Sequence, residues 1–118
     1  MKTLAQRRAA MALNHATSIQ QGQGDGNVLS GFPMLVRVDG LMAALALAVE
    51  KKDDGSLKHK GEFSIAEAIV DHLREEKIVE ASKPLDLARE LASGDAILLR
   101  RATAETLAFL SCLKRYAA

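Results

Sequence analysis

The chain has 118 residues, of which 48% are hydrophobic, and its formal net charge is +1. This length fits a single domain, here residues 1–118, and the apolar content supports a buried core, which excludes a disordered tail. The one cysteine, Cys112, excludes an internal disulfide framework and a cysteine-based zinc finger.

The sequence predicts a first helix over residues 2–20, because Leu4, Ala12 and Ile19 recur at helical spacing. Arg8 falls on this same apolar face, so we expect it to be a paired, partly buried structural residue. Residues 21–30 follow as a glycine-rich loop that we expect to be poorly ordered. A phosphate-binding glycine loop needs a strand before it, and none is predicted, so we expect no nucleotide there.

A second helix is predicted over 31–51, with Pro33 tolerated in its first turn. One apolar stripe runs through Met34, Val38, Leu41, Leu45 and Val49, while Val36 and Leu47 lie on the opposite side. A helix that is apolar on both sides belongs in the middle of a bundle. We expect Gly40 to weaken or bend this central helix.

Residues 52–62 form a predicted polar loop, and three further helices follow it. The third begins at Ser64 with a Ser64–Glu67 capping box and buries Ile65, Ile69, Val70 and Leu73. The fourth begins at Pro84 and ends at Gly94 in a left-handed cap. The fifth spans 95–116, with a core stripe of Leu98, Ala102, Thr106, Phe109, Leu113 and Tyr116. The prediction is therefore an all-α bundle of five to six helices.

Charge is unevenly distributed along the chain. Residues 1–24 carry three basic and no acidic side chains, residues 62–95 have a net charge of −5, and residues 96–118 have a net charge of +3. This polarity predicts a positive surface built from the two termini.

The last predicted helix carries the candidate binding site. Arg100, Arg101, Lys114 and Arg115 lie opposite its core stripe, with Ala104, Ala108 and Ser111 between them and Glu105 at the edge. Small side chains among cations allow a polyanion backbone to approach closely. The helix dipole explains cations in the last turn but not Arg100 and Arg101 near the start. We therefore predict nucleic-acid phosphate contacts at these four residues, with Arg7 contributing.

No other chemistry is indicated. His72 is the one histidine with carboxylates at helical spacing, Glu75 and Glu76, and this group is typical of a solvated helix face. Cys112 has no histidine nearby and is typical of a small apolar residue. We expect no metal, no cofactor and no enzymatic activity. Charges stand where a signal peptide needs its apolar run, so we expect none, and no uncharged apolar stretch is long enough for a membrane span. We therefore expect a cytoplasmic protein with no membrane partner.

Three segments resemble one known family. They are "QRRAAMAL", "FPMLVRVDGLMAALAL" and "LRRATAETLAFLSCLKRYAA", and the resemblance runs from about Gln6 to Tyr116. In this order and spacing they resemble the small all-helical subunit of the Cmr complex, the type III-B CRISPR effector. Two positions depart from the family pattern: Asp39 stands where the family favours Asn, and Cys112 where it favours Trp.

The resemblance implies a non-catalytic subunit in an antiviral, RNA-targeting effector. Such subunits stack in more than one copy beside the other Cmr subunits and line the groove where target RNA pairs with guide RNA. An alternative is a free-standing helical nucleic-acid-binding or adaptor module. A third hypothesis, an enzyme that uses Cys112 or His72, has no catalytic constellation in the sequence to support it.

Overall fold

The protein is built from α-helices. The computed structural model describes residues 1–23 and 26–117, and within them there are six helices and no β-strand. The helices are α1 (Leu4–Gln23), α2 (Gly26–Asp39), α3 (Leu41–Ala48), α4 (Lys60–Glu75), α5 (Pro84–Ser93) and α6 (Ala96–Ala117). The all-α class predicted from the sequence is confirmed.

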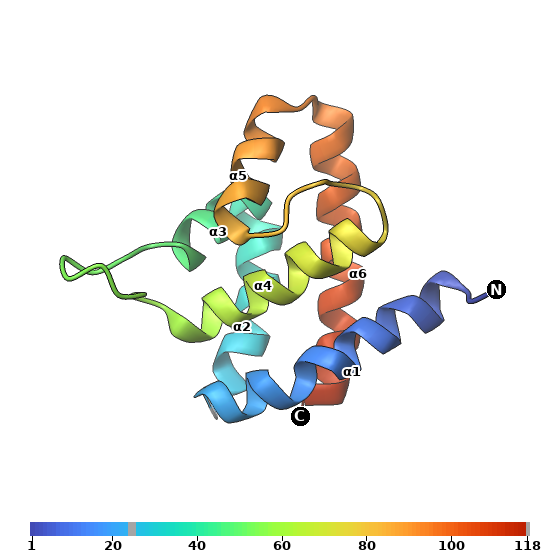
Figure 1. Cartoon of the computed structure of the whole chain (residues 1–118), viewed down its shortest axis with the longest axis horizontal. Coiled ribbons are helices and arrows are strands. Elements are labelled where there is room, and N and C mark those ends of the chain that lie inside the picture. The colour runs from blue at the N-terminus through green and yellow to red at the C-terminus, as the bar shows by residue number, and fades with distance from the viewer. Residues whose placement is uncertain (24–25, 118) are drawn as a thin grey trace.

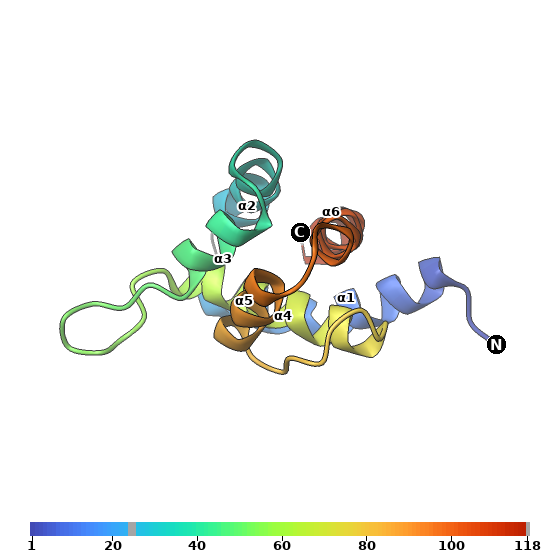
Figure 2. The same ribbon diagram turned by 90° about the horizontal axis from the view of Figure 1, so that it is seen from above.

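The helices lie in two layers (Figures 1 and 2). Helices α1, α4 and α5 form one layer, and α2 and α6 form the other, with α3 beside α2. Helix α4 contacts each of the other five helices, and α1 packs across α6. The centre of the bundle is therefore α4, rather than the 31–51 segment that the sequence analysis placed there.

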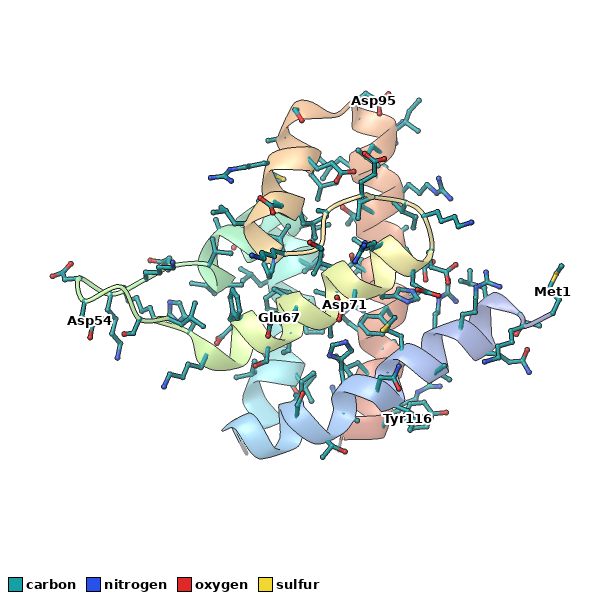
Figure 3. The ribbon with its side chains drawn as sticks, viewed as in Figure 1. Met1, Asp54, Glu67, Asp71, Asp95 and Tyr116 are labelled. Carbon is teal, nitrogen blue, oxygen red and sulfur yellow. The ribbon has the colours of Figure 1, made fainter. Side chains whose placement is uncertain are left out.

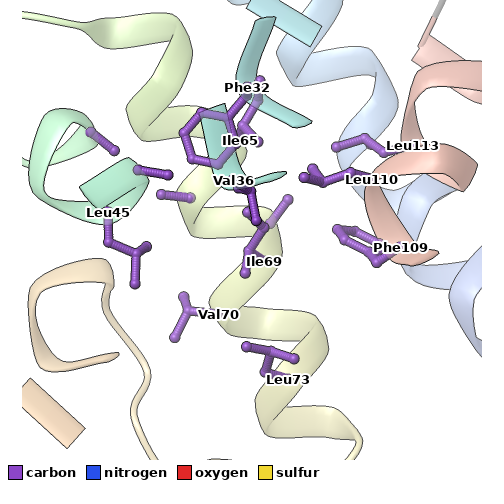
Figure 4. Close-up of a cluster of buried hydrophobic side chains, with 14 of the residues drawn as sticks. Phe32, Val36, Leu45, Ile65, Ile69, Val70, Leu73, Phe109, Leu110 and Leu113 are labelled. Carbon is purple, nitrogen blue, oxygen red and sulfur yellow. The ribbon is translucent and has the colours of Figure 1, made fainter. Parts of the chain in front are cut away.

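The core forms around the apolar face of α4. Its four predicted core residues, Ile65, Ile69, Val70 and Leu73, are all buried, which confirms that face. Figure 4 shows side chains of α2, α3 and α6 converging on it. These partners are Phe32, Val36, Leu45, Phe109, Leu110 and Leu113.

The predicted single helix over 31–51 is two helices, α2 and α3, separated at Gly40. Gly40 has φ 95° and ψ 159°, a conformation that essentially only glycine adopts. Because the break changes the helical phase, residues at helical spacing on the two sides of Gly40 do not share one face. The single apolar stripe predicted through 31–51 is therefore wrong. Met34 and Val38 are 57% and 70% exposed, and Val36 is buried instead.

The predicted glycine-rich loop over 21–30 is largely helical. Helix α1 continues to Gln23 and α2 begins at Gly26, while residues 24–25 lie outside the described residues. Glycines lose more conformational entropy in a helix than other residues do. The burial of Leu29 against the core offsets part of this cost for the start of α2. The expectation of a loop is therefore wrong for residues 21–23 and 26–30. Poor order of this segment and the absence of nucleotide binding stay predictions.

Two predicted helix boundaries also need correction. Helix α4 begins at Lys60 rather than Ser64, and its N-cap, His59, makes no side-chain capping bond, so the capping box is wrong. The polar loop before it is a short hairpin in which the Lys52 N–H donates to the Ser56 carbonyl at 2.8 Å. Gly94 ends α5 with φ −87°, an extended rather than left-handed conformation. The chain must extend there to place Asp95 as the cap of α6.

Candidate nucleic-acid interface

Helix α6 presents one face to the core and another to solvent. The Asp95 carboxylate accepts a 2.8 Å bond from the Leu98 N–H and starts the helix. Ala102, Thr106, Phe109 and Leu113 are buried as predicted. The ends of the predicted stripe differ, because Leu98 is only partly buried and Tyr116 is 45% exposed. The buried stripe is therefore shorter than the sequence pattern indicates.

The four predicted cations of α6 are all exposed: Arg100, Arg101, Lys114 and Arg115. Within residues 1–23 and 26–117, no carboxylate forms an ion pair with any of them. The two pairs are 14 positions apart, which is roughly 21 Å along a helix. We call this surface the α6 cationic face.

Small side chains separate the two pairs of cations. Ala104 and Ser111 are exposed between them, and Ala108 is half-buried. Leu107 also lies between the pairs on this side of the helix, and its side chain is partly buried against the core. A linear polyanion can therefore lie along the face and contact both pairs.

The one acidic residue within α6, Glu105, is turned away from this face. Its carboxylate accepts bonds from Arg8 Nε at 2.7 Å and Arg8 Nη2 at 2.8 Å, and lies 2.8 Å from His72 Nε2. The Arg8 bonds hold the pKa of Glu105 below its ordinary value, although burial opposes this shift. The expectation that Arg8 is a paired, partly buried residue is confirmed.

Arg7 is also held by a carboxylate. Its Nε and Nη2 donate to Glu76 at 2.8 and 3.1 Å, and its Nη1 donates to the Lys2 carbonyl at 2.7 Å. The hydrogen bonds with Glu76 raise the pKa of Arg7, although burial opposes this shift. The Glu76 side chain is only 9% exposed, so the expectation that Glu76 is free surface charge is wrong. Most of the unbalanced positive charge near the two termini therefore belongs to α6.

A groove between α1 and α6 brings two predicted site residues together. It has a volume of about 390 Å³. Its lining residues are Leu4, Arg7, Arg8, Glu76, Ile78, Arg101, Ala104 and Glu105. Arg101 thus extends the α6 cationic face toward Arg7, whereas Arg100, Lys114 and Arg115 do not line this groove.

His72 does not lie on a solvated face, which corrects the sequence interpretation. It is 1% exposed, and its ring stacks on Phe109 with centroids 4.5 Å apart. Its Nδ1 and the Thr106 Oγ1 are buried without a hydrogen-bond partner among the described residues. His72 therefore belongs to the junction of α4 and α6. In the same part of the chain, no cluster of three or more His, Cys, Asp or Glu side chains is arranged to hold a metal ion.

Sequence reasoning missed Glu105 as the shared partner of Arg8 and His72, because the three residues come from different helices. Arg8 and Glu105 are 97 positions apart, and no local pattern reports such a pair. The position of Glu105 at the edge of the cationic face was the available signal, since that edge is the one that meets α1.

Comparisons with known proteins give one match. The family model described as CRISPR-associated protein (Cas_Cmr5) matches residues 4–118. No curated protein and no solved structure matches the chain significantly. Across residues 1–23 and 26–117, none of the helices has the length and apolar content needed to cross a membrane.

Proposed function

Because the chain belongs to the CRISPR-associated Cas_Cmr5 family, whose members work within a CRISPR effector complex, we propose that it is a non-catalytic structural subunit of a type III-B effector. In this proposal, further copies of the subunit stack along the complex beside the other Cmr subunits. The α6 cationic face contacts the backbone of target RNA that is paired with guide RNA.

The observation that carries this proposal is the α6 cationic face itself. A cation near the positive N-terminal end of a helix dipole is mildly unfavourable, so Arg100 and Arg101 do not serve the stability of α6. No described carboxylate forms an ion pair with either of them. Phosphate contacts position a strand without reading its sequence, which suits a subunit that contacts variable targets.

Arg7 has a secondary role in this proposal. Its side chain is 40% exposed at the groove that Arg101 also lines, but two of its nitrogens already donate to Glu76. It adds positive potential near Arg101 and keeps few free donors for a phosphate. Direct contact therefore rests mainly on the four cations of α6.

The test compares RNA affinity across a salt series for assembled complexes. The variant is Arg100→Ala with Arg101→Ala, and the matched control is Lys51→Ala with Lys52→Ala, which removes two exposed charges from the hairpin before α4. Each lost phosphate contact flattens the slope of log affinity against log salt by about 0.7 for a single strand. We expect the arginine variant to flatten the slope by about 1.4 for each copy of the subunit that contacts the RNA, with little dependence on target sequence.

Both double variants should fold, because exposed substitutions usually change stability by less than about 0.5 kcal/mol. If the arginine variant and the lysine control have the same slope and affinity as the wild type, the RNA-contact assignment must be withdrawn. If the chain does not copurify with other Cmr subunits, the alternative of a free-standing helical nucleic-acid-binding or adaptor module is favoured instead.

A further inference from the structure

The outward side of α2 is apolar, whereas the solvent side of a surface helix normally carries polar residues. Met34 and Val38 are 57% and 70% exposed, and Gly31 is exposed as well. These three positions are spaced by three and four residues, so they form one stripe along α2. Residues 28–36 contain no charged side chain. We call Gly31, Met34 and Val38 the α2 apolar stripe.

A groove opens beside this stripe, where α2 meets α3 and the start of α4. It has a volume of about 200 Å³. Its lining residues are Val28, Gly31, Phe32 and Leu35 of α2, Leu47 of α3 and Glu62 of α4. Small-molecule sites typically have about 300–1,000 Å³, so this groove suits a single side chain of another protein instead. Gly31 belongs to both the stripe and the groove, so one partner surface can cover the two together.

Glu62 is the one charged residue among those that line the groove. It lies in the first turn of α4, where the helix dipole favours a carboxylate. Glu62 is half-buried, and no cation in the described part of the chain forms an ion pair with it. Its charge is therefore left for a cation from another molecule.

An arginine side chain matches this combination of groups. Its aliphatic stem packs on apolar walls, and its guanidinium forms two parallel bonds with a carboxylate. Arginine is enriched at protein interfaces, whereas lysine is depleted there. RNA is a poorer match, because the stripe offers no cation and Glu62 repels phosphates.

We propose that α2 docks a different protein chain of the effector, which inserts an arginine side chain into this groove against Glu62. Apolar residues around that arginine cover Met34 and Val38. The inference rests on the proposed place of the chain in an assembled effector. It is independent of the RNA contact of α6, because no α6 residue lines the groove.

The first test is competition for assembly. Effector complexes are purified from cells that express equal amounts of the wild-type chain and one variant, and mass spectrometry compares the two chains in the complex and in the free pool. Glu62→Gln should enter complexes about tenfold less than the wild type, because the arginine loses its charged partner. The matched control is Glu67→Gln on the same helix (Figure 3), which lines a different groove and should compete equally.

Val38→Gln is a second variant, chosen because a substitution at this exposed position does not threaten the fold. It removes apolar contact but keeps the carboxylate, and it should also enter complexes less than the wild type. Thermal unfolding of each isolated chain checks that the variants fold. Equal competition by either folded variant would overturn the proposal.

A photocrosslinking amino acid in place of Met34 identifies the occupant in assembled complexes. A crosslink to a different protein chain, at a segment that contains an arginine, supports the proposal. Replacement of that arginine by Gln should then remove the effect of Glu62→Gln. Crosslinks to a segment without arginine, to a second copy of this chain or to RNA would overturn the proposal.

These outcomes are distinct from a failure of the proposed function. If the wild-type chain does not copurify with other Cmr subunits, the proposed function fails. If the wild type assembles and both variants compete equally with it, only the docking inference fails.

Discussion

At the scale of single residues, the junction of three helices depends on one carboxylate. Glu105 of α6 binds Arg8 of α1 and lies within hydrogen-bond distance of buried His72 of α4. The sequence predicted that Arg8 would be paired, because a cation on an apolar face needs a partner. It could not identify the partner, since ion pairs between distant elements leave no local periodicity.

Substitution of Glu105 should reveal this role through the pH dependence of stability. At pH 7, Glu105→Gln should lower the free energy of unfolding by roughly 1–3 kcal/mol, because Arg8 loses a charged acceptor. The pKa of Glu105 is lowered in the folded protein, so its stabilisation is present above the ordinary carboxyl pKa and is lost as pH falls toward the folded value. The measurement is denaturant unfolding of both proteins from pH 7 to pH 3.

The groups that face Glu105 are Arg8 from α1 and His72 from α4, with the Arg7–Glu76 pair nearby, and all four remain in the variant. The stability difference between the two proteins should therefore shrink below about pH 4.3. If the difference in the free energy of unfolding between the two proteins stays constant from pH 7 to pH 3, the ionised carboxylate of Glu105 is not its source.

At the scale of helices, the backbone conformation of one glycine divides α2 from α3. The sequence analysis correctly identified Gly40 as the position where the predicted helix is weak. It did not predict two separate helices, because a periodic pattern assumes one continuous helical phase. The face of α4 was predicted correctly, since no break interrupts Ile65, Ile69 and Leu73.

Two glycine substitutions should have opposite effects on stability. Gly40→Ala should destabilise the protein by about 1–3 kcal/mol, because φ 95° with ψ 159° is strained for any side chain. Gly31→Ala, within α2 and with open space at its Cβ position, should instead stabilise it by about 0.5–1 kcal/mol. Thermal or denaturant unfolding of both variants measures this contrast. Equal effects would mean that the backbone at Gly40 does not require glycine.

A second pair of substitutions tests which side of this region packs on the core. Leu45→Ala should lower the free energy of unfolding by roughly 2–5 kcal/mol, because Leu45 is fully buried. Val38→Ala, at a position 70% exposed, should change it by less than about 0.5 kcal/mol. Denaturant unfolding compares the two, and a large loss in Val38→Ala would restore the continuous stripe predicted from the sequence.

At the scale of the whole molecule, folding redistributes the charge that the sequence displays. Arg7 and Arg8 contribute to the positive N-terminal segment, yet Arg7 forms an ion pair with Glu76 directly after α4, and Arg8 forms one with Glu105 of α6. The sequence predicted the α6 cationic face correctly, because an exposed helix face follows from its buried stripe. It overestimated the contribution of the N-terminal segment, because only the tertiary structure determines which charges are neutralised.

The packing of α1 across α6 also bears on synthesis of the protein. Helix α1 can pack on α4 earlier, but Arg8 and Glu105 are separated by 97 positions, so α1 meets α6 only when almost the whole described chain has been made. Until α6 has been made, it cannot cover the alanine-rich face of α1. The side of His72 that stacks on Phe109 is uncovered for the same reason. The bundle therefore closes late, after α6 has left the exit tunnel, and a nascent chain that stalls before α6 exposes apolar surface to chaperones and proteases.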